Sequence, residues 1–260
     1  MHAAERERLI LAAMAPSGFV SYRELEARLD ASPATIRRDL SRLESEGRIA
    51  RLHGGAKLLE GRDEAAQFRL MGTPFDQSIT QNLAAKQAIG KAAAALCAPG
   101  EGIMIDGGTT TLQMCPHLAG LNCQVLTNSL HIVNALLPQP GTRLLVPSGA
   151  VFREQNIILA AAGEASMPRF HAPKLFMGAA AIGHQGIMQA DVVLVASERR
   201  FIDHAEQVIL MVDSSKFEKS SGTIVCGLDE IDLVITDSGI PNFMRAALEK
   251  AGAGVVIADA

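Results

Sequence analysis

The sequence is poor in the residues that support disulfide, metal and large aromatic chemistry. Its 260 residues include no tryptophan, one tyrosine and four cysteines. Cys97, Cys115, Cys123 and Cys226 show no Cys-x-x-Cys spacing and lie among apolar neighbours. This arrangement predicts reduced core cysteines and argues against a disulfide or a zinc site. We therefore expect no bound metal and no cofactor.

Long apolar runs are also missing. The chain has no stretch of about 18 apolar residues, which is the length that a membrane-spanning helix needs. Charges at Glu5, Arg6, Glu7 and Arg8 precede only a short apolar run, unlike the pattern of a signal peptide. The sequence thus predicts a cytoplasmic protein with no membrane partner.

Charge is unevenly distributed. The formal net charge is -4, yet residues 1–70 hold 12 Lys and Arg against 11 Asp and Glu. Between Ala31 and Lys57 the chain carries six cations and three anions. A local basic patch of this kind is where attraction to the phosphates of nucleic acid would act. Residues 107–142, by contrast, contain no Asp, Glu, Lys or Arg, which is typical of a buried or ligand-facing segment.

The beginning of the chain reads as three helices followed by a hairpin. Residues 4–14 have the pattern of a first helix, and Ser21 followed by Glu24 is a capping-box pattern that opens a second. Ser32 is an N-cap candidate for a third helix. Residues 48–55 then carry a short β-hairpin signature. This order of elements indicates a winged helix-turn-helix.

The third helix has an apolar side and a cationic side. Ile36, Leu40 and Leu43 fall together on a helical wheel and are expected to face the core. The opposite side suits the major groove of DNA, where arginine binds guanine or phosphate. The alternative is a solvated helix whose arginines pair with Asp39 and Glu44, but the ordered context favours DNA. The residues that we expect to contact bases or phosphates are Ser32, Ala34, Thr35, Arg37, Arg38, Ser41, Arg42, Arg48, Arg51 and Lys57.

The tract Ser32–Ala56 resembles the signature of DeoR-type transcriptional repressors, which is Ser-x-x-Thr-x-Arg-Arg-Asp-Leu-x-x-Leu followed by a Gly-Gly-Ala wing. The matching residues are Ser32, Thr35, Arg37, Arg38, Asp39, Leu40, Leu43, Gly54, Gly55 and Ala56. The resemblance implies a bacterial, nucleoid-associated regulator, usually a repressor of a carbohydrate-utilisation operon, that binds a double-stranded DNA operator. A lone recognition helix contacts only a half-site, so we expect a homo-oligomer, either a dimer or a tetramer.

Apolar runs of strand length alternate with helical stretches in the rest of the chain. The strand candidates are Gly102–Asp106, Gln124–Asn128, Arg143–Pro147, Lys174–Met177, Val208–Asp213, Leu233–Thr236 and Gly254–Ala258. Helices fit between several of them, for example at Leu130–Leu137 and Asn242–Ala251. This alternation predicts an α/β domain with a mainly parallel sheet. The expected division is a DNA-binding domain at 1–58, a linker at 59–80 and a larger α/β sensor domain at 81–260.

Polar tracts follow several of the predicted strands, at the carboxyl ends where open α/β sheets bind ligands. Gly107–Thr111 offers backbone N–H groups and hydroxyls that suit a phosphate, although an ordinary tight turn is the alternative. Ser129 is equally an N-cap candidate. Since residues 107–142 are uncharged, the countercharge must come from elsewhere. The residues that we expect around one common ligand are Lys86, Asp106, Gly107, Gly108, Thr109, Thr110, Thr111, Thr127, Asn128, Ser129, Ser148, Gly149, Arg153, Asp213 and Lys216.

This part of the chain resembles the effector domain of DeoR-type repressors. Lys86, the Ile-Asp-Gly-Gly-Thr-Thr turn, Thr-Asn-Ser and Val-Asp-Ser-Ser-Lys-Phe follow one another in the family's order. That domain is similar to ribose-5-phosphate isomerases, so the resemblance implies an isomerase-like fold and a phosphorylated sugar effector. It places Lys86 and residues 107–111 at the phosphate, with Asn128, Asp213 and Lys216 near the sugar.

Two tracts depart from the family pattern and leave the identity of the sugar open. Gly178–Ile182 reads Gly-Ala-Ala-Ala-Ile where the family often has Gly-Ala-Asp-Gly, and Ala196–Phe201 lacks the expected Glu and Lys in register. An alternative function is a sugar-phosphate isomerase with an appended helical domain, in which Asp213, Asp191 or Glu198 serves as the base. A regulator that has lost its ligand is a third alternative.

Overall fold

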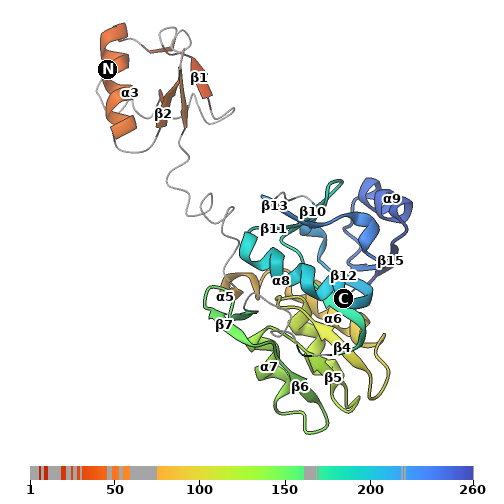
Figure 1. The fold of residues 1–260 in the computed structure, drawn as a ribbon. Helices are drawn as coiled ribbons and strands as arrows, with labels where there is room; N and C mark the ends of the chain where they lie inside the picture. Colours follow the sequence, from red (N-terminus) through yellow and green to blue (C-terminus); the bar gives the residue numbers. More distant parts are fainter. Residues whose placement is uncertain are drawn as a thin grey trace. The chain divides into compact units, whose positions relative to one another are not determined.

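The computed structural model describes residues 6, 9–10, 19–21, 25, 28–29, 31–45, 49–52, 55–58, 75–160, 168, 170–217, 219 and 221–259, and the structural statements below concern these residues. The chain forms two units, Met1–Phe68 and Arg69–Ala260 (Figure 1). Each unit is taken by itself.

The N-terminal unit has the predicted helix and wing. Helix α3 (Pro33–Ser45) is followed by β2 (Ile49–Leu52) and β3 (Gly55–Leu58), which pair antiparallel as the expected hairpin, and β1 (Phe19–Ser21) pairs with β3 on its other edge. Isolated positions of the first two predicted helices are helical, and the rest of those helices lies outside the described residues. The buried core residues of this unit are Ile10, Val20, Leu25, Leu29, Ile36, Leu40, Leu43, Ile49 and Ala56.

A seven-stranded parallel sheet forms the centre of the C-terminal unit, and it contains all seven predicted strands. The strand order is β15-β14-β12-β9-β4-β5-β6, and every neighbouring pair is parallel. The strands are β4 (Gly102–Ile105), β5 (Gln124–Leu126), β6 (Arg143–Leu145), β9 (Ala172–Met177), β12 (Ala205–Met211), β14 (Leu233–Thr236) and β15 (Gly254–Ile257). The predicted α/β architecture is therefore confirmed.

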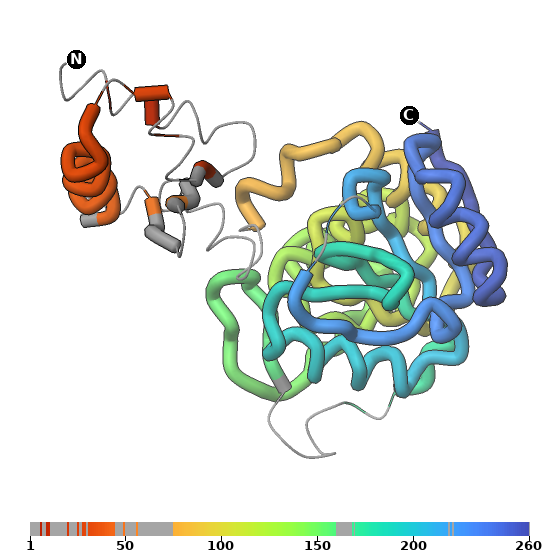
Figure 2. Tube along the Cα trace, turned by 90° about the horizontal axis from the view of Figure 1, so that it is seen from above, coloured from red at the N-terminus to blue at the C-terminus, as the bar shows by residue number. Residues whose placement is uncertain are grey.

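Helices cover both faces of this sheet. On β4, Ile103 and Ile105 belong to one apolar core and Met104 to the other, as the two-residue period of a strand requires. The first core is completed by α6 (Leu83–Ala94), η1 (Thr111–Leu118) and α7 (Leu130–Leu136). The second is completed by α8 (Val192–Asp203) and α9 (Asn242–Ala251), and α9 lies at the outside of the unit in dark blue in Figure 2. Cys115, Cys123 and Cys226 are buried in these cores, as predicted.

Two small sheets were not anticipated from the sequence. The hairpin of β7 (Gly149–Phe152) and β8 (Ile157–Ala160) follows β6, which is an edge strand of the large sheet. Strands β10 (Ala181–Gly183), β11 (Gly186–Gln189) and β13 (Thr223–Cys226) form an antiparallel sheet. Two short 3-10 helices, η3 (Ser214–Lys216) and η4 (Leu228–Glu230), follow β12 and β13. Within the described part of the chain, no helix is long and apolar enough to cross a membrane.

Residues at the end of the predicted linker form part of the C-terminal unit. Phe75–Ser78 is the short helix α5, and Phe75 is buried. The Phe75 ring stacks on the His131 ring of α7, with centroids 3.8 Å apart and an angle of 6° between the planes. The polar composition of 59–80 hid this contact, because a single aromatic side chain makes it.

The segment that follows the turn after Asp106 is the 3-10 helix η1. Pro116 lies inside η1, where it lacks the N–H that a regular α-helix would use. Helix α6 approaches η1 closely at Gly90. A Cβ atom at Gly90 would lie 2.5 Å from the carbonyl carbon of Gln113, which is closer than real Cβ atoms come to backbone. Gly90 therefore sets the position of the turn that precedes η1.

Replacing this glycine tests the close packing. Alanine raises helix propensity by about 1 kcal/mol over glycine, so an unhindered Gly90→Ala change would stabilise the protein. The clash with Gln113 predicts instead a loss of about 1–3 kcal/mol in the free energy of unfolding, measured by urea denaturation followed by circular dichroism. Gly222→Ala is the control, because nothing lies within 4 Å of a Cβ atom there. An unchanged or higher stability of Gly90→Ala would contradict the packing.

Candidate functional site

Helix α3 presents its cationic side to solvent and is capped as predicted. The Ser32 hydroxyl accepts a hydrogen bond from the backbone N–H of Thr35 at 3.2 Å and lies 2.8 Å from the Thr35 hydroxyl. Ile36, Leu40 and Leu43 are buried, while the opposite side is exposed. The exposed residues among those expected to contact DNA are Ser32, Ala34, Arg37, Arg38, Ser41 and Arg42.

Asp39 is paired with a residue of the first helix and not with the arginines beside it. The Arg6 guanidinium donates to both carboxylate oxygens of Asp39, at 2.7 and 3.3 Å. This pair ties the start of the chain to α3 and leaves Arg37 and Arg38 exposed. The alternative interpretation supposed that Asp39 neutralises the exposed arginines of its own helix, and Asp39 is paired with Arg6 instead.

The wing residues are described less fully. Arg51 and Lys57 lie in strands β2 and β3, in register with Ala56 and Ala50, and their side chains lie outside the described residues. Arg48 lies outside them altogether. The contacts of these three side chains with DNA therefore stay predictions.

In the C-terminal unit, polar side chains meet where β4 and β5 end. Asp106 follows β4 and Asn128 follows β5, and these strands are neighbours in the sheet. The Asn128 amide donates to the Asp106 carboxylate at 2.9 Å and to the Ser197 hydroxyl of α8 at 3.3 Å, while its oxygen accepts from the Gly107 N–H at 3.1 Å. The predicted ligand residues Asp106, Gly107 and Asn128 thus lie together at one edge of the sheet, as expected for parallel strands. We call Asp106, Asn128, Gln189, Ser197 and Glu198 the Asp106 cluster.

The loop after Asp106 keeps backbone donors available. Among the described residues, the N–H groups of Gly108, Thr109 and Thr110 have no acceptor. Thr111 was expected to offer its hydroxyl to a ligand, and the structure contradicts this. Its side chain is fully buried and donates to the carbonyl oxygens of Asp106 and Gly108, at 2.8 and 3.0 Å. Thr111 therefore holds the loop in shape.

The predicted ligand set missed three residues of this cluster, Gln189, Ser197 and Glu198, of which Glu198 on α8 carries a carboxyl group. Its side chain is 3% exposed, and one carboxyl oxygen accepts a hydrogen bond from the Gln189 amide of β11. The other oxygen is buried and has no hydrogen-bond partner within the described structure. Burial and the nearby Asp106 raise the pKa of Glu198 well above its ordinary value. The only sequence signal was that Glu198 stands in a tract that departs from the family pattern.

Asp106 is also shifted. Burial raises the pKa of its carboxyl to about 6, and the hydrogen bond from Asn128 and the N–H of Gly107 oppose the rise. Two buried carboxyl groups therefore lie close together, and at neutral pH they share less than two full negative charges. Perturbed carboxyl groups of this kind cluster at functional sites more often than elsewhere.

A second polar group, the Asp213 cluster, consists of Asn82, Lys86, Asp213, Ser215 and Lys216. The Asp213 carboxylate accepts from the Asn82 amide at 2.7 Å and from the Ser215 N–H at 3.2 Å. Burial opposes ionisation of Asp213, but the hydrogen bonds from Ser215 and Asn82 and the charges of Lys216 and Lys86 together lower its pKa. A pocket of about 400 Å³ opens here, lined by Asn82–Ala85, Asp213–Ser215 and Asp237.

The two lysines of this cluster differ in their surroundings. Lys86 is 1% exposed, and its ammonium donates to the Ser78 carbonyl at 2.6 Å, so its charge is used inside the protein. Burial lowers the pKa of Lys86, and Asp213 opposes this. Lys216 is half-buried, and burial together with Lys219 lowers its pKa to about 8. Lys86 thus supports Asp213, in place of the predicted contact with the loop at 107–111.

The predicted ligand residues therefore fall into two groups along one sheet edge. The Asp106 cluster lies at β4 and β5 and the Asp213 cluster at β12, with β9 between them. Strand β9 runs directly into Gly178, Ala179 and Ala180, so the polar side chain that the family often carries at this point is absent.

The remaining predicted residues divide into structural and exposed ones. Ser129 is the N-cap of α7 and accepts from the Ile132 N–H at 3.4 Å, and the Thr127 hydroxyl accepts from the Ser129 N–H at 3.1 Å. Ser148, Gly149 and Arg153 lie in or beside the β7–β8 hairpin and are exposed. That hairpin packs against the end of β5, since the Ile158 N–H donates to the Asn128 carbonyl at 2.7 Å.

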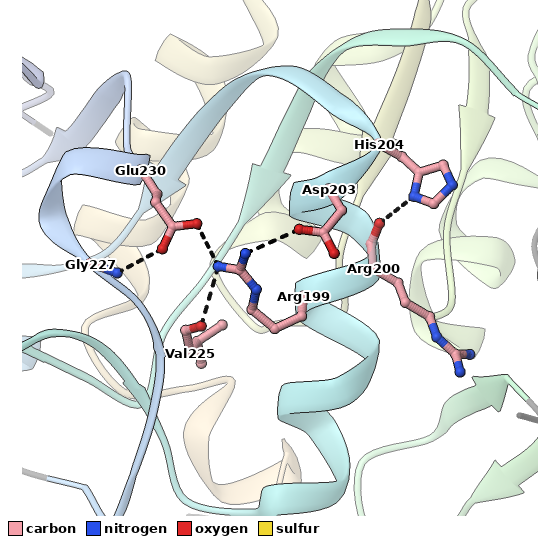
Figure 3. Close-up of polar contacts among 7 residues, drawn as sticks. All are labelled: Arg199, Arg200, Asp203, His204, Val225, Gly227 and Glu230. Atoms are coloured by element: carbon pink, nitrogen blue, oxygen red, sulfur yellow. Dashed lines mark hydrogen bonds and ion pairs between the residues drawn. The ribbon is translucent and has the colours of Figure 1, made fainter.

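Arg199 links helix α8 to neighbouring elements. Its guanidinium contacts Glu230 at 2.6 Å, Asp203 at 3.0 Å and the carbonyl of Val225 at 3.5 Å, as Figure 3 shows. Glu230 in turn accepts from the Gly227 N–H at 3.1 Å. These contacts join α8 to β13 and η4, so the residue next to Glu198 is held by three separate partners.

No metal site is apparent in the described ranges. Their histidine, cysteine, aspartate and glutamate side chains form no group of three or more that could hold an ion.

Comparison with known proteins gives matches over both units. The model of the DeoR-like helix-turn-helix domain matches residues 6–62, and that of the DeoR C terminal sensor domain matches residues 81–238. A protein of Escherichia coli O157:H7 named as an aga operon transcriptional repressor is 31% identical over 256 residues, covering 97% of this chain and 93% of that protein. The HTH-type transcriptional regulator UlaR of Escherichia coli strain K12 / DH10B is 28% identical over 257 residues, covering 98% and 99%.

Solved structures resemble parts of the chain. The probable sor operon regulator from Shigella flexneri has a TM-score of 0.41 at 10% identity, covering 66% of this chain and 90% of that one. Ribose 5-phosphate isomerase A from Methanocaldococcus jannaschii has a TM-score of 0.37 at 13% identity, covering 55% of each chain.

The pKa of Asp106 makes stability depend on pH. Because the pKa is raised to about 6, the folded protein holds this proton more tightly than the unfolded chain does. The resulting stability is fully present below about pH 4 and is lost as the pH rises through about 6. Asp106→Asn removes the titration. The free energy of unfolding of Asp106→Asn minus that of the wild type should therefore increase by on the order of 1–3 kcal/mol from about pH 4 to pH 7. Urea denaturation measures both.

The matched control is Asp229→Asn, because Asp229 is exposed. Its difference from the wild type should stay level over the same range. A level difference for Asp106→Asn would show that Asp106 titrates as it does in the unfolded chain, and would contradict its burial.

Proposed function

The chain belongs to the DeoR family of transcriptional regulators, and from this premise we propose that it represses a carbohydrate-utilisation operon under the control of a phosphorylated sugar. The observation that carries the proposal is the presence of both family domains in one chain, with a capped helix that exposes arginines in the first. We divide the chain into a DNA-binding domain at 1–58, a connecting segment, and a sensor domain that begins earlier than residue 81, at α5.

For DNA recognition we assign α3 to the major groove. Arg37, Arg38 and Ser41 lie on its exposed side. Arg42 flanks that side, and Ser32 and Thr35 lie at the N-terminal end, which enters the groove deepest. The wing residues Arg48, Arg51 and Lys57 would hold flanking phosphates.

For the effector we assign the phosphate to the loop at Gly107–Thr110. Its free N–H groups point to an anion, and the uncharged neighbourhood of η1 offers no competing carboxylate other than the partly neutralised Asp106 cluster. The sugar would extend along the sheet edge toward Asp213 and Lys216. The effector acts by binding one arrangement of the subunits better than the other.

The functional unit we propose is a homo-oligomer in the bacterial cytoplasm, associated with the nucleoid. One α3 contacts a half-site only, so a two-fold pair of chains matches a palindromic operator. We assign it no catalytic role, a view supported by the names of its relatives, which are transcriptional regulators.

Arg38→Ala separates DNA contact from folding. Arg38 is exposed, so the melting temperature should change by less than about 1 °C, while affinity for the operator falls about tenfold. If Arg38 binds a phosphate, the slope of log affinity against log salt should also fall by about one. Fluorescence anisotropy with the chain's own upstream region measures both. Arg245→Ala is the control, since Arg245 is an exposed arginine on α9, and equal affinities of the two variants would contradict the assignment of α3.

The effector is tested in the same assay. Ribose 5-phosphate, glucose 6-phosphate, fructose 6-phosphate and galactose 6-phosphate are added to the protein–operator complex, with the unphosphorylated sugars as controls. At least one phosphorylated sugar should change operator affinity by a factor of about 5–150, the usual size of allosteric coupling. Specific DNA binding that responds to none of these sugar phosphates would contradict the proposal that a phosphorylated sugar is the effector.

A further inference from the structure

One buried oxygen atom in the Asp106 cluster lacks a hydrogen-bond partner. Among the described residues, Glu198, Ser221 and Thr236 are those with a buried side-chain oxygen left unpaired, and Glu198 is the one that carries a carboxyl group. A buried polar group without a partner costs about 1–3 kcal/mol, and more where it is charged. Glu198 carries this cost within the described structure.

The position of Glu198 places the unpaired oxygen beside the ligand loop. Its neighbour Ser197 accepts from the Asn128 amide, and the same amide binds Asp106 while its oxygen holds the Gly107 N–H. Glu198 follows Ser197 directly on α8, and Asp106 contributes to the rise in its pKa. The Asn128–Ser197 hydrogen bond brings this part of α8 to the sheet edge where β4 and β5 end.

The side chain is not able to find a partner by turning away. One carboxyl oxygen is held by the Gln189 amide of β11. On the next residue, Arg199 binds Glu230, Asp203 and the Val225 carbonyl, which fixes the register of α8 against β13 (Figure 3). Within the described residues the free oxygen has no partner, so it is available to a group of a bound ligand.

The chemistry of the cluster indicates which group fits. A carboxyl group that keeps its proton can both donate and accept one hydrogen bond, and a carboxylate can only accept. A sugar hydroxyl can donate and accept, so it satisfies either form. The sheet edge also lacks the polar side chain that other family members often supply after β9, where this chain has Ala179 and Ala180. Glu198, which lies on α8, offers a polar side chain in place of the one that is missing after β9.

We propose that Glu198 determines sugar specificity by forming a hydrogen bond with a hydroxyl group of the effector, whose phosphate lies on the loop after Asp106. The inference rests on the proposed sugar-phosphate effector. It assigns to α8 a ligand contact that neither the family pattern nor the predicted ligand set contains.

The experiment measures binding by isothermal titration calorimetry on the full chain. The probes are inorganic phosphate and whichever of ribose 5-phosphate, glucose 6-phosphate, fructose 6-phosphate and galactose 6-phosphate binds the wild type. Glu198→Leu should weaken binding of that sugar phosphate about tenfold or more, because one buried hydrogen bond is lost. It should leave affinity for inorganic phosphate within about twofold. Glu198→Gln keeps a hydrogen-bonding group and should restore most of the sugar-phosphate affinity.

Glu206→Leu is the matched control, because Glu206 is a largely exposed glutamate on β12 and should bind both probes as the wild type does. Glu198→Leu removes the unpaired oxygen but also the acceptor of the Gln189 amide, so the melting temperature is measured beside binding to establish that the variant is folded. A merely structural role for Glu198 would weaken both probes equally, and that result would overturn the proposal.

The outcomes also separate this inference from the proposed function. If a sugar phosphate binds the wild type and Glu198→Leu equally well, Glu198 is not a specificity residue, and the effector proposal stands. If no sugar phosphate binds the wild type, the effector proposal falls and this inference falls with it.

Should Glu198→Leu fail to fold, the wild type and Glu198→Gln are compared on pairs of ligands that differ by one hydroxyl, such as ribose and 2-deoxyribose 5-phosphate or glucose and 2-deoxyglucose 6-phosphate. Loss of the contacted hydroxyl should cost the wild type more affinity than it costs Glu198→Gln. Equal losses for every pair would overturn the proposal.

Discussion

The three hydrogen bonds of the Asn128 amide hold together the parts on which ligand recognition depends. They join the end of β4 through Asp106, the first residue of the loop through Gly107, and helix α8 through Ser197. Asp106 and Gly107 are consecutive, Asn128 follows β5 and Ser197 lies on α8, and the fold brings these three stretches of the chain to one edge. Without this amide the carboxyl of Asp106 would lose its main compensation for burial, and the loop would lose the contact that sets where it begins.

Charge at this edge is arranged so that an anion is tolerated beside two acids. A phosphate near two ionised carboxylates would be repelled, but burial raises the pKa of both Asp106 and Glu198 and favours their neutral forms. The cations lie further along, where Lys216 and Lys86 adjoin Asp213. The edge therefore carries two acids with raised pKa values at β4 and β5, and an acid beside two lysines at β12.

The parts of the molecule that follow from local patterns could be predicted from the sequence. The seven strands of the large sheet are short apolar runs, and the third helix has both its cap and its apolar period, so each was found from residues close together in the chain. The internal hydrogen bonds of Thr111 and Lys86 were missed for a common reason. Their side chains are buried and bind carbonyl oxygens of the protein, at Asp106 and Ser78, and burial of a polar residue is decided by tertiary packing that no local pattern reports.

Glu198 shows the same limit. Its burial, and the influence of Asp106 from a strand far away in the sequence on its pKa, depend on tertiary packing that no local pattern reports.

The stacking of Phe75 on His131 gives the structure a mechanical property. Helix α7 starts directly after Asn128 and Ser129, and its first turn carries the ring on which the earliest described residue of the C-terminal unit rests. The stacked rings thus link α5 to the residue three positions after Asn128, so α5 and the end of β5 are joined by one aromatic contact and one helical turn.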